Sequence, residues 1–227
     1  MFRILKNIKY KLATLFLIFK MNGSASAQTP SANFESEINY YRQADIAGDL
    51  FPHPILFIGS SSIKNWKDLD SSFEGYNCLN RGFGGSTISD VIYYADDVIF
   101  NHDPKQIVLY CGENDFAKDS ASAATVFLRF YDLYSLIRNK FPDVPIVYIS
   151  IKPSPAKERM LYQINDYNKL IKDFVSNQTN IVYADVYSKM IGSNGQPDRS
   201  LFYEDMLHMN EKGYAVWNEA LRPFLIN

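Results

Sequence analysis

Five short, mostly apolar runs alternate with segments of helical periodicity along this 227-residue chain. Runs of this length and character are typical of strands buried on both faces of a parallel sheet, whereas half-exposed strands alternate apolar and polar residues. Helices between parallel strands make right-handed crossovers and cover both faces of the sheet, which predicts an α/β three-layer sandwich. The predicted strands are residues 55–58, 76–80, 106–110, 146–151 and 181–186.

The segments between these runs carry apolar residues at the spacing of amphipathic helices. One set is Val126, Phe130, Leu133 and Ile137, and we also expect a helix over residues 34–47 before the first strand. Thr87-Ile-Ser-Asp90 resembles a capping box for a helix that runs to about Phe100, and Asn210 is placed to cap the last helix.

Length and charge exclude several classes of protein. A chain of 227 residues suits one domain with a full hydrophobic core. The 23 Lys and Arg nearly balance the 25 Asp and Glu, so the overall charge predicts no nucleic-acid partner. No internal apolar run is long enough to span a membrane, and the sequence gives no indication of oligomeric state.

The N-terminus resembles an export signal. Basic residues precede a short apolar run at 12–19, and Ala25-Ser-Ala27 supplies a cleavage motif, which predicts export to the periplasm or outside the cell. Lys20, directly after the apolar run, is untypical, so retention as a short amphipathic anchor stays open. The expected division is a signal peptide at 1–27, a linker at 28–33 and one domain at 34–227.

Cys78 and Cys111 are the only cysteines, and both fall in or next to predicted strands. In a sheet of strand order 2-1-3-4-5, those strands lie on opposite sides of the first strand. Two interstrand spacings come to roughly 9–10 Å, which exceeds the ~7 Å limit between the Cα atoms of a disulfide. We therefore expect two buried free thiols that pack as small apolar residues.

Polar segments follow three of the predicted strands, and a fourth precedes the last helix: residues 59–62, 80–87, 112–115 and 205–208. The carboxyl ends of parallel strands meet at one edge of a sheet, where α/β proteins place ligands and reacting groups. These segments contain a run of three serines, a glycine-rich loop, Gly-Glu-Asn-Asp and Asp-Met-Leu-His. We expect them to lie together.

The combination has the parts that acyl transfer requires. A serine hydroxyl needs a base to take its proton, and His208 needs a carboxylate such as Asp205 to orient it. The oxyanion needs preorganised donors, which the N–H of Gly85, the amide of Asn114 and the N–H of Ser61 can supply. Asp185, after the last strand, stays open as an alternative carboxylate.

From the first strand to the last helix, the order Ser, Gly, Asn and Asp-x-x-His resembles the SGNH hydrolase superfamily, the GDSL-type esterases and lipases. The resemblance implies a flavodoxin-like fold with strand order 2-1-3-4-5. It also implies a serine esterase acting on a small-molecule, carbohydrate or lipid ester, with short acyl groups such as O-acetyl expected. The residues that match the family motifs are Ser61, Asp205 and His208 as the triad, with Ser61, Gly85 and Asn114 as the oxyanion hole.

Three positions depart from the family pattern. Ser60 stands where the motif has Asp, which makes Ser60 and Ser62 competitors for the nucleophile. Met206 replaces a common Gly, and Glu113 introduces a charge near the pocket. Arg81, also near the site, is expected to pair with Glu113 or Asp115, or to bind an anionic group.

An alternative is a flavodoxin-like or carbohydrate-binding module without catalytic activity, which would hold a phosphate or flavin at the glycine-rich loop or bind sugar without turnover. The chain has no P-loop lysine and no Gly-x-Gly-x-x-Gly spacing, which disfavours the nucleotide form. No residues have metal-ligand spacing, so we expect neither metal nor cofactor. His53 and His102 are expected to be structural.

Overall fold

The structure, a computed structural model, describes residues 34–48 and 52–227. Its centre is a five-stranded sheet in the order β2-β1-β3-β4-β5, and every neighbouring pair of strands is parallel. The strands are β1 (Ile55–Gly59), β2 (Cys78–Gly82), β3 (Gln106–Tyr110), β4 (Ile146–Ile149) and β5 (Ile181–Ala184). Both the predicted α/β class and the predicted strand order are confirmed.

The strand boundaries show where the sequence pattern was imprecise. β3 has the predicted bounds, whereas β2 lies two residues later because its register pairs Ile55 with Cys78 and Gly59 with Gly82. β4 and β5 each end two residues early. Beyond these ends, the Ser150 hydroxyl oxygen accepts hydrogen bonds from the N–H groups of Val186 and Tyr187, at 3.0 and 2.9 Å. A side chain thus takes the place of the backbone hydrogen bonds that would pair the two strands.

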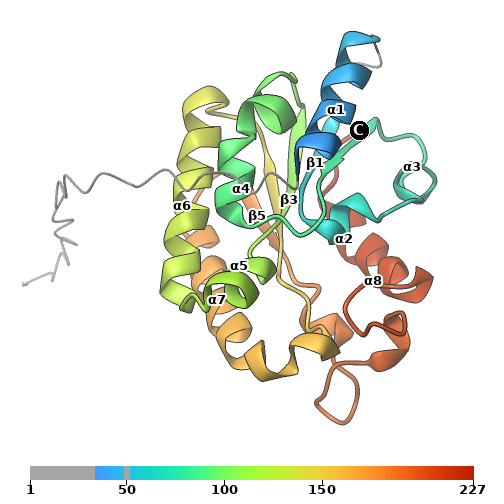
Figure 1. Ribbon diagram of the computed structural model, residues 1–227, viewed down its shortest axis with the longest axis vertical. Coiled ribbons are helices and arrows are strands. Elements are labelled where there is room, and N and C mark those ends of the chain that lie inside the picture. Colours follow the sequence, from blue (N-terminus) through green and yellow to red (C-terminus); the bar gives the residue numbers. More distant parts are fainter. Residues whose placement is uncertain (1–33, 49–51) are drawn as a thin grey trace, which may run out of the picture.

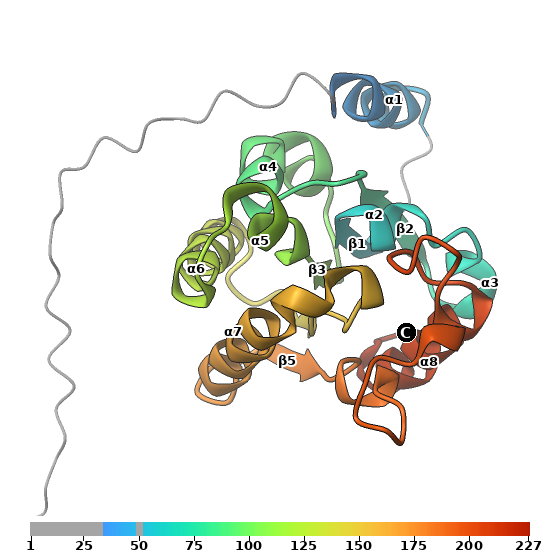
Figure 2. The same cartoon turned by 60° about the horizontal axis from the view of Figure 1, so that its bottom comes forward.

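Helices cover both faces of the sheet (Figures 1 and 2). One apolar cluster packs α4, α6 and α7 against one face, and a second packs α2, α3 and α8 against the other. The helices and helical turns are α1 (Glu35–Ile46), α2 (Ser61–Lys64), α3 (Leu69–Ser72), α4 (Ile88–Tyr93), η2 (Asp96–Phe100), α5 (Glu113–Asp119), α6 (Ala123–Lys140), η3 (Pro155–Met160), α7 (Leu161–Val175), η4 (Ser188–Met190), η5 (Arg199–Leu201), α8 (Glu211–Leu221) and η6 (Arg222–Phe224). The sheet is therefore buried on both sides, as its continuous apolar strands require.

Two predicted caps begin helices in the structure. Thr87 and Asp90 form a reciprocal capping box at α4, and the Asn210 side chain accepts the N–H groups of Lys212 and Gly213 at α8. The prediction of one helix from Thr87 to about residue 100 was wrong. α4 ends at Tyr93, and the π-helical turn η2 follows, so the segment packs as two short pieces.

Cys78 and Cys111 are buried free thiols, as expected. Cys78 lies in β2 and Cys111 directly follows β3, so β1 separates them. Burial raises the pKa of Cys78 to about 12 and that of Cys111 well above its usual range. Both thiols therefore stay protonated and unreactive at neutral pH.

The predicted signal peptide and linker fall outside the described residues, and both remain predictions. Within residues 34–48 and 52–227, no helix combines the length and apolar character needed to cross a membrane.

The end of β1 requires glycine. Gly59 has φ +138°, and a Cβ there would lie 1.8 Å from the Tyr110 carbonyl oxygen on β3. We expect Gly59→Ala to lower the free energy of unfolding by about 3 kcal/mol or more, because backbone strain and a backbone clash combine. Gly75 is the matched control, since it has φ +86° with nothing within 4 Å of a Cβ.

Gly75→Ala should therefore cost about 1 kcal/mol through strain alone. Urea unfolding of both variants measures the difference. Equal losses would show that the close approach of Gly59 to β3 is unimportant.

Candidate active site

Four separate segments meet at the carboxyl edge of the sheet (Figure 2). Ser61 is the first residue of α2, directly after β1, and Gly85 lies in the loop between β2 and α4. Asn114 is in the first turn of α5, after β3, while Asp205 and His208 lie in the loop before α8. The short α2 and α5 begin at this edge because their strands end there, so topology brings the segments together as predicted.

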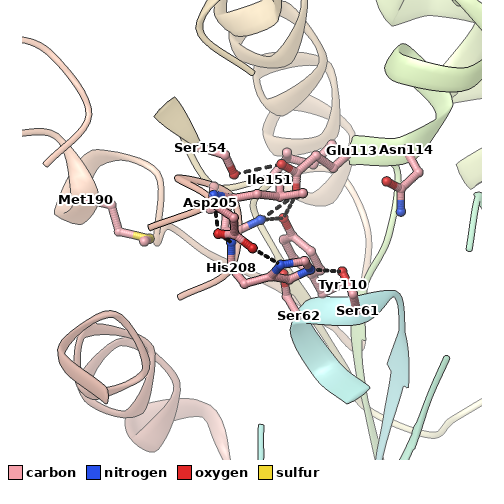
Figure 3. Close-up of polar contacts among 12 residues, drawn as sticks. Ser61, Ser62, Tyr110, Glu113, Asn114, Ile151, Ser154, Met190, Asp205 and His208 are labelled. Atoms are coloured by element: carbon pink, nitrogen blue, oxygen red, sulfur yellow. Dashed lines mark hydrogen bonds and ion pairs between the residues drawn. The ribbon is translucent and has the colours of Figure 1, made fainter. Parts of the chain in front are cut away.

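A chain of polar contacts joins three of the predicted residues (Figure 3). Ser61 Oγ lies 3.2 Å from His208 Nε2, and Asp205 Oδ2 lies 2.6 Å from His208 Nδ1. Ser61 is partly exposed, whereas Ser60 and Ser62 are only 3% and 2% exposed. Of the three serines, Ser61 is therefore the one in contact with the histidine, and it is accessible.

Backbone donors hold the Asp205 carboxylate. Its Oδ1 accepts the N–H groups of Leu207 and His208, both at 2.9 Å. Partial burial acts to raise the pKa of Asp205, but these N–H groups and the His208 ring outweigh it and lower the pKa to about 2. The carboxylate is thus ionised at neutral pH and fixed against His208 Nδ1.

Met206, in the loop between Asp205 and His208, has a strained backbone conformation. Its φ is +55°, in the left-handed region that a residue with a side chain rarely adopts. The Met206 carbonyl accepts the N–H of Ala156 at 2.9 Å, and its N–H donates to Tyr203 at 2.9 Å. The left-handed turn explains why glycine suits this position, and here hydrogen bonds at both ends hold methionine in its place.

The three predicted oxyanion donors belong to segments that follow β1, β2 and β3. The N–H of Ser61 belongs to the first turn of α2, where no intrahelical acceptor exists. Gly85 has φ +78°, and nothing lies within 4 Å of where its Cβ would stand, so the approach to its backbone is open. Asn114 Nδ2 donates to the Ser86 carbonyl at 3.0 Å, which fixes the amide next to the glycine loop. That bond uses one of its two hydrogens.

The other candidates occupy structural roles. Asp185 Oδ1 accepts the N–H of Ser188, and Asp205 takes the place beside His208. His53 pairs with Asp103 at 3.1 Å on the surface. His102, in contrast, is buried, and this burial lowers the pKa of its ring.

The expectation for Arg81 was wrong in its partner. The guanidinium pairs with Asp45 and lies over the Tyr41 ring, 4.9 Å from its centroid. Arg81 is in β2, an edge strand against which α1 residues pack, and so reaches Asp45 rather than the carboxylates after β3.

Glu113 places a carboxylate next to Asn114, but this carboxylate is buried and paired. The side chain is buried and bonded to Tyr110, Lys152 and Ser154. The sequence reasoning missed these partners. The available signal was Lys152, which directly follows Ile151 at the end of the fourth predicted strand. A lysine buried at that sheet edge needs a carboxylate partner.

A groove of about 720 Å³ opens beside the Asp205–His208 loop. Three aromatic side chains, Trp66, Tyr203 and Tyr214, line it together with Asp205 and His208. Tyr203 is 56% exposed, so its ring is available to a ligand. The volume lies in the range of small-molecule sites.

Comparison with known proteins identifies a family. The sequence model of the GDSL-like lipase/acylhydrolase family matches residues 59–216. No curated protein matches the chain at a significant level of sequence similarity.

Several solved structures share the fold. A Streptococcus pneumonia protein named for platelet activating factor has a TM-score of 0.74 at 20% identity, over 85% of this chain and 92% of the other. A GDSL-like lipase from Bacteroides thetaiotaomicron has a TM-score of 0.67 at 18% identity, over 82% and 97% of the two chains. An acetyl-xylooligosaccharide esterase variant from Geobacillus stearmophilus has a TM-score of 0.63 at 14% identity, over 77% and 95%.

The family match spans all four segments that the sheet brings together, from the end of β1 to α8. At identities this low, the likeness to the solved structures shows a shared fold. The substrates of those proteins cannot be transferred to this chain on that basis. On the strength of the family match, the chain belongs to the GDSL-like lipase/acylhydrolase family of the SGNH hydrolase superfamily and is a carboxylic ester hydrolase.

Proposed function

We propose that the protein hydrolyses short-chain carboxylic esters through an acyl-enzyme on Ser61. The observation that carries the proposal is the contact chain from Ser61 Oγ through His208 to Asp205, at 3.2 and 2.6 Å. Ser61 Oγ attacks the ester carbonyl carbon while His208 Nε2 takes its proton. Asp205 keeps the remaining proton on Nδ1 and stabilises the imidazolium.

The tetrahedral intermediate carries its negative charge on the former carbonyl oxygen. The N–H groups of Ser61 and Gly85 and the second amide hydrogen of Asn114 receive it in this proposal. Collapse breaks the ester C–O bond, and His208 gives its proton to the leaving alcohol. Water, activated by His208, then attacks the acyl-enzyme and releases the acid and free Ser61.

The groove suggests the alcohol part of the substrate. The leaving alcohol departs beside His208, and the groove lined by Tyr203, Tyr214 and Trp66 begins at the same residue. Aromatic faces with polar neighbours suit a sugar or another polyhydroxylated alcohol. An O-acetylated saccharide outside the cytoplasm, reached through the predicted export signal, is the substrate class we propose.

A substrate series tests the acyl and alcohol preferences together. With p-nitrophenyl esters from acetate to octanoate, we expect kcat/KM to fall as the acyl chain lengthens. We expect acetylated saccharides to be hydrolysed as well. A rise with chain length would contradict the short-acyl proposal, and absence of turnover on every ester would favour the binding-module alternative.

Tyr203→Ala tests the groove separately from the chemistry. We expect it to raise KM for an acetylated saccharide by about fivefold, since a lost aromatic contact is worth about 1 kcal/mol. KM for methyl acetate, whose leaving alcohol has no ring or sugar to contact Tyr203, should stay unchanged. Tyr93→Ala is the matched control, because Tyr93 is 57% exposed on α4 and does not line the groove. Equal changes in KM for Tyr203→Ala and Tyr93→Ala would show that the groove does not bind the saccharide.

A further inference from the structure

A buried carboxylate lies directly beside the proposed oxyanion residue. Glu113 precedes Asn114 in the first turn of α5, and its two oxygens accept three hydrogen bonds (Figure 3). Lys152 Nζ and Tyr110 OH lie 2.5 and 2.8 Å from Oε2, and Ser154 Oγ lies 2.7 Å from Oε1. The carboxylate therefore has little freedom to rotate or shift.

Lys152 comes from a different part of the chain and is equally buried. It follows β4, its side chain is 1% exposed, and the Glu113 side chain is 6% exposed. Lys152 Nζ also lies 5.6 Å from the centroid of the Tyr110 ring. Burial alone would raise the pKa of Glu113, but Lys152 and the other donors lower it on balance. The Glu113 carboxyl is thus ionised and is held against Lys152 Nζ.

An ion pair this deep is an inefficient way to gain stability. Removing two charges from water costs several kcal/mol per ion, and an apolar pair of similar volume is often as stable or more so. Hydrophobic side chains could fill the same space between β3 and β4. A role for the pair beyond stability is therefore a reasonable inference, because its directional bonds fix geometry that apolar packing would leave adjustable.

The network connects the two halves of the proposed active site. On one side, Glu113 is covalently adjacent to Asn114, whose amide is bonded to the Ser86 carbonyl beside Gly85. On the other side, Ser154 lies two residues before Ala156, whose N–H holds the Met206 carbonyl in the Asp205–His208 loop. The oxyanion side and the acid–base side are thus tied to one carboxylate.

We propose that the Glu113–Lys152 pair, with Ser154, is a positioning unit that fixes the Asn114 amide relative to Ser61 and His208 during acyl transfer. Neither residue contacts the reacting atoms in this proposal. Glu113 acts through Asn114, and Lys152 and Ser154 act by holding Glu113. The inference rests on the proposed function only in taking Asn114 as an oxyanion donor.

The test is a double-mutant cycle between the pair and Asn114. The four enzymes are the wild type, Asn114→Ala, the charge-free pair variant Glu113→Gln/Lys152→Met, and the triple variant. The pair variant avoids leaving one buried charge without its partner. kcat and KM are measured with p-nitrophenyl acetate, and thermal unfolding confirms that each enzyme is folded.

We expect Asn114→Ala to lower kcat by about 10²–10³-fold, the usual loss for one oxyanion donor. The pair variant should lower kcat by about 10- to 100-fold with KM nearly unchanged, because misplacement by about 1 Å affects the transition state most. The triple variant should be no slower than Asn114→Ala alone. Losses that multiply, or a folded pair variant with wild-type kcat, would overturn the proposal.

Two further variants complete the design. Asp45→Asn/Arg81→Met removes another buried ion pair, one outside the proposed catalytic machinery, and should change stability without changing kcat. If the Glu113→Gln/Lys152→Met protein does not fold, Ser154→Ala replaces it in the cycle, since it removes one bond to Glu113 and no charge. Ser154→Ala should then lower kcat severalfold, with no further loss in the Asn114→Ala background.

The outcomes separate this inference from the proposed function. A slow Asn114→Ala enzyme with an unaffected pair variant would reject the positioning unit alone. An Asn114→Ala enzyme with wild-type kcat would reject Asn114 as an oxyanion donor, and the positioning inference with it, while the role of Ser61 would stand on its own tests.

Discussion

Ser61→Ala is expected to lower kcat for p-nitrophenyl acetate by about 10⁶-fold, the scale found when a serine protease loses its nucleophile. Alanine has no oxygen to attack the carbonyl, and the Ser61 contact with His208 Nε2 disappears. Only the oxyanion donors and substrate binding then remain to assist attack by water. Steady-state kinetics under saturating substrate measure the loss, and KM should change little.

Ser60 and Ser62 provide the controls for that experiment. Both flank Ser61, and both are buried, at 3% and 2% exposure. Ser60→Ala and Ser62→Ala each remove one hydroxyl from the same turn, and both enzymes should keep kcat within a few-fold of the wild type. A loss for Ser62→Ala as large as that for Ser61→Ala would mean that the motif register had selected the wrong serine.

Asp205→Asn is expected to lower kcat by about 10⁴-fold, as tautomer-reversing substitutions do in serine hydrolases. An asparagine amide donates a hydrogen to His208 Nδ1, which places the ring proton on Nε2. His208 then cannot take the proton of Ser61. Glu204→Gln is the control, since it makes a comparable change at the exposed neighbouring position. Equal kcat values for Asp205→Asn and the wild type would exclude Asp205 as the orienting carboxylate.

The same variant makes a prediction about acid stability. The pKa of Asp205 is about 2 in the folded protein, below the ~3.9 of an unfolded aspartate. The carboxylate therefore stabilises the fold fully above pH ~4, and this contribution is lost as pH falls through about 2. Thermal unfolding should show the wild type more stable than Asp205→Asn at pH 7, with the gap closing toward pH 2. A gap that widens on acidification would contradict the assignment.

Much of the fold could be predicted because the signals were local. Apolar runs marked the five strands, and Thr87 and Asn210 marked two helix starts. Topology predicted that the segments holding Ser61, Gly85 and Asn114 meet at one edge, since they follow parallel strands. The resemblance to the family motifs then selected these three residues. Strand ends were less accurate because Ser150 replaces the ladder through its side chain, a contact that no local pattern encodes.

The buried polar network could not be predicted because its partners are far apart in the sequence. Glu113 and Lys152 are separated by 39 positions. In the sequence, neither residue identifies the other as its partner. Only the register of β3 beside β4 brings them together. Similarly, the left-handed turn at Met206 depends on bonds to Ala156 and Tyr203 rather than on the preference of methionine.

The identity of the nucleophile is tested most directly by covalent labelling. The full-length enzyme is treated with a fluorophosphonate, and the adduct is located by intact mass and peptide mapping. The account predicts a single adduct on Ser61 and no labelling of Ser61→Ala. An adduct on another residue, or labelling of Ser61→Ala at the wild-type rate, would contradict it.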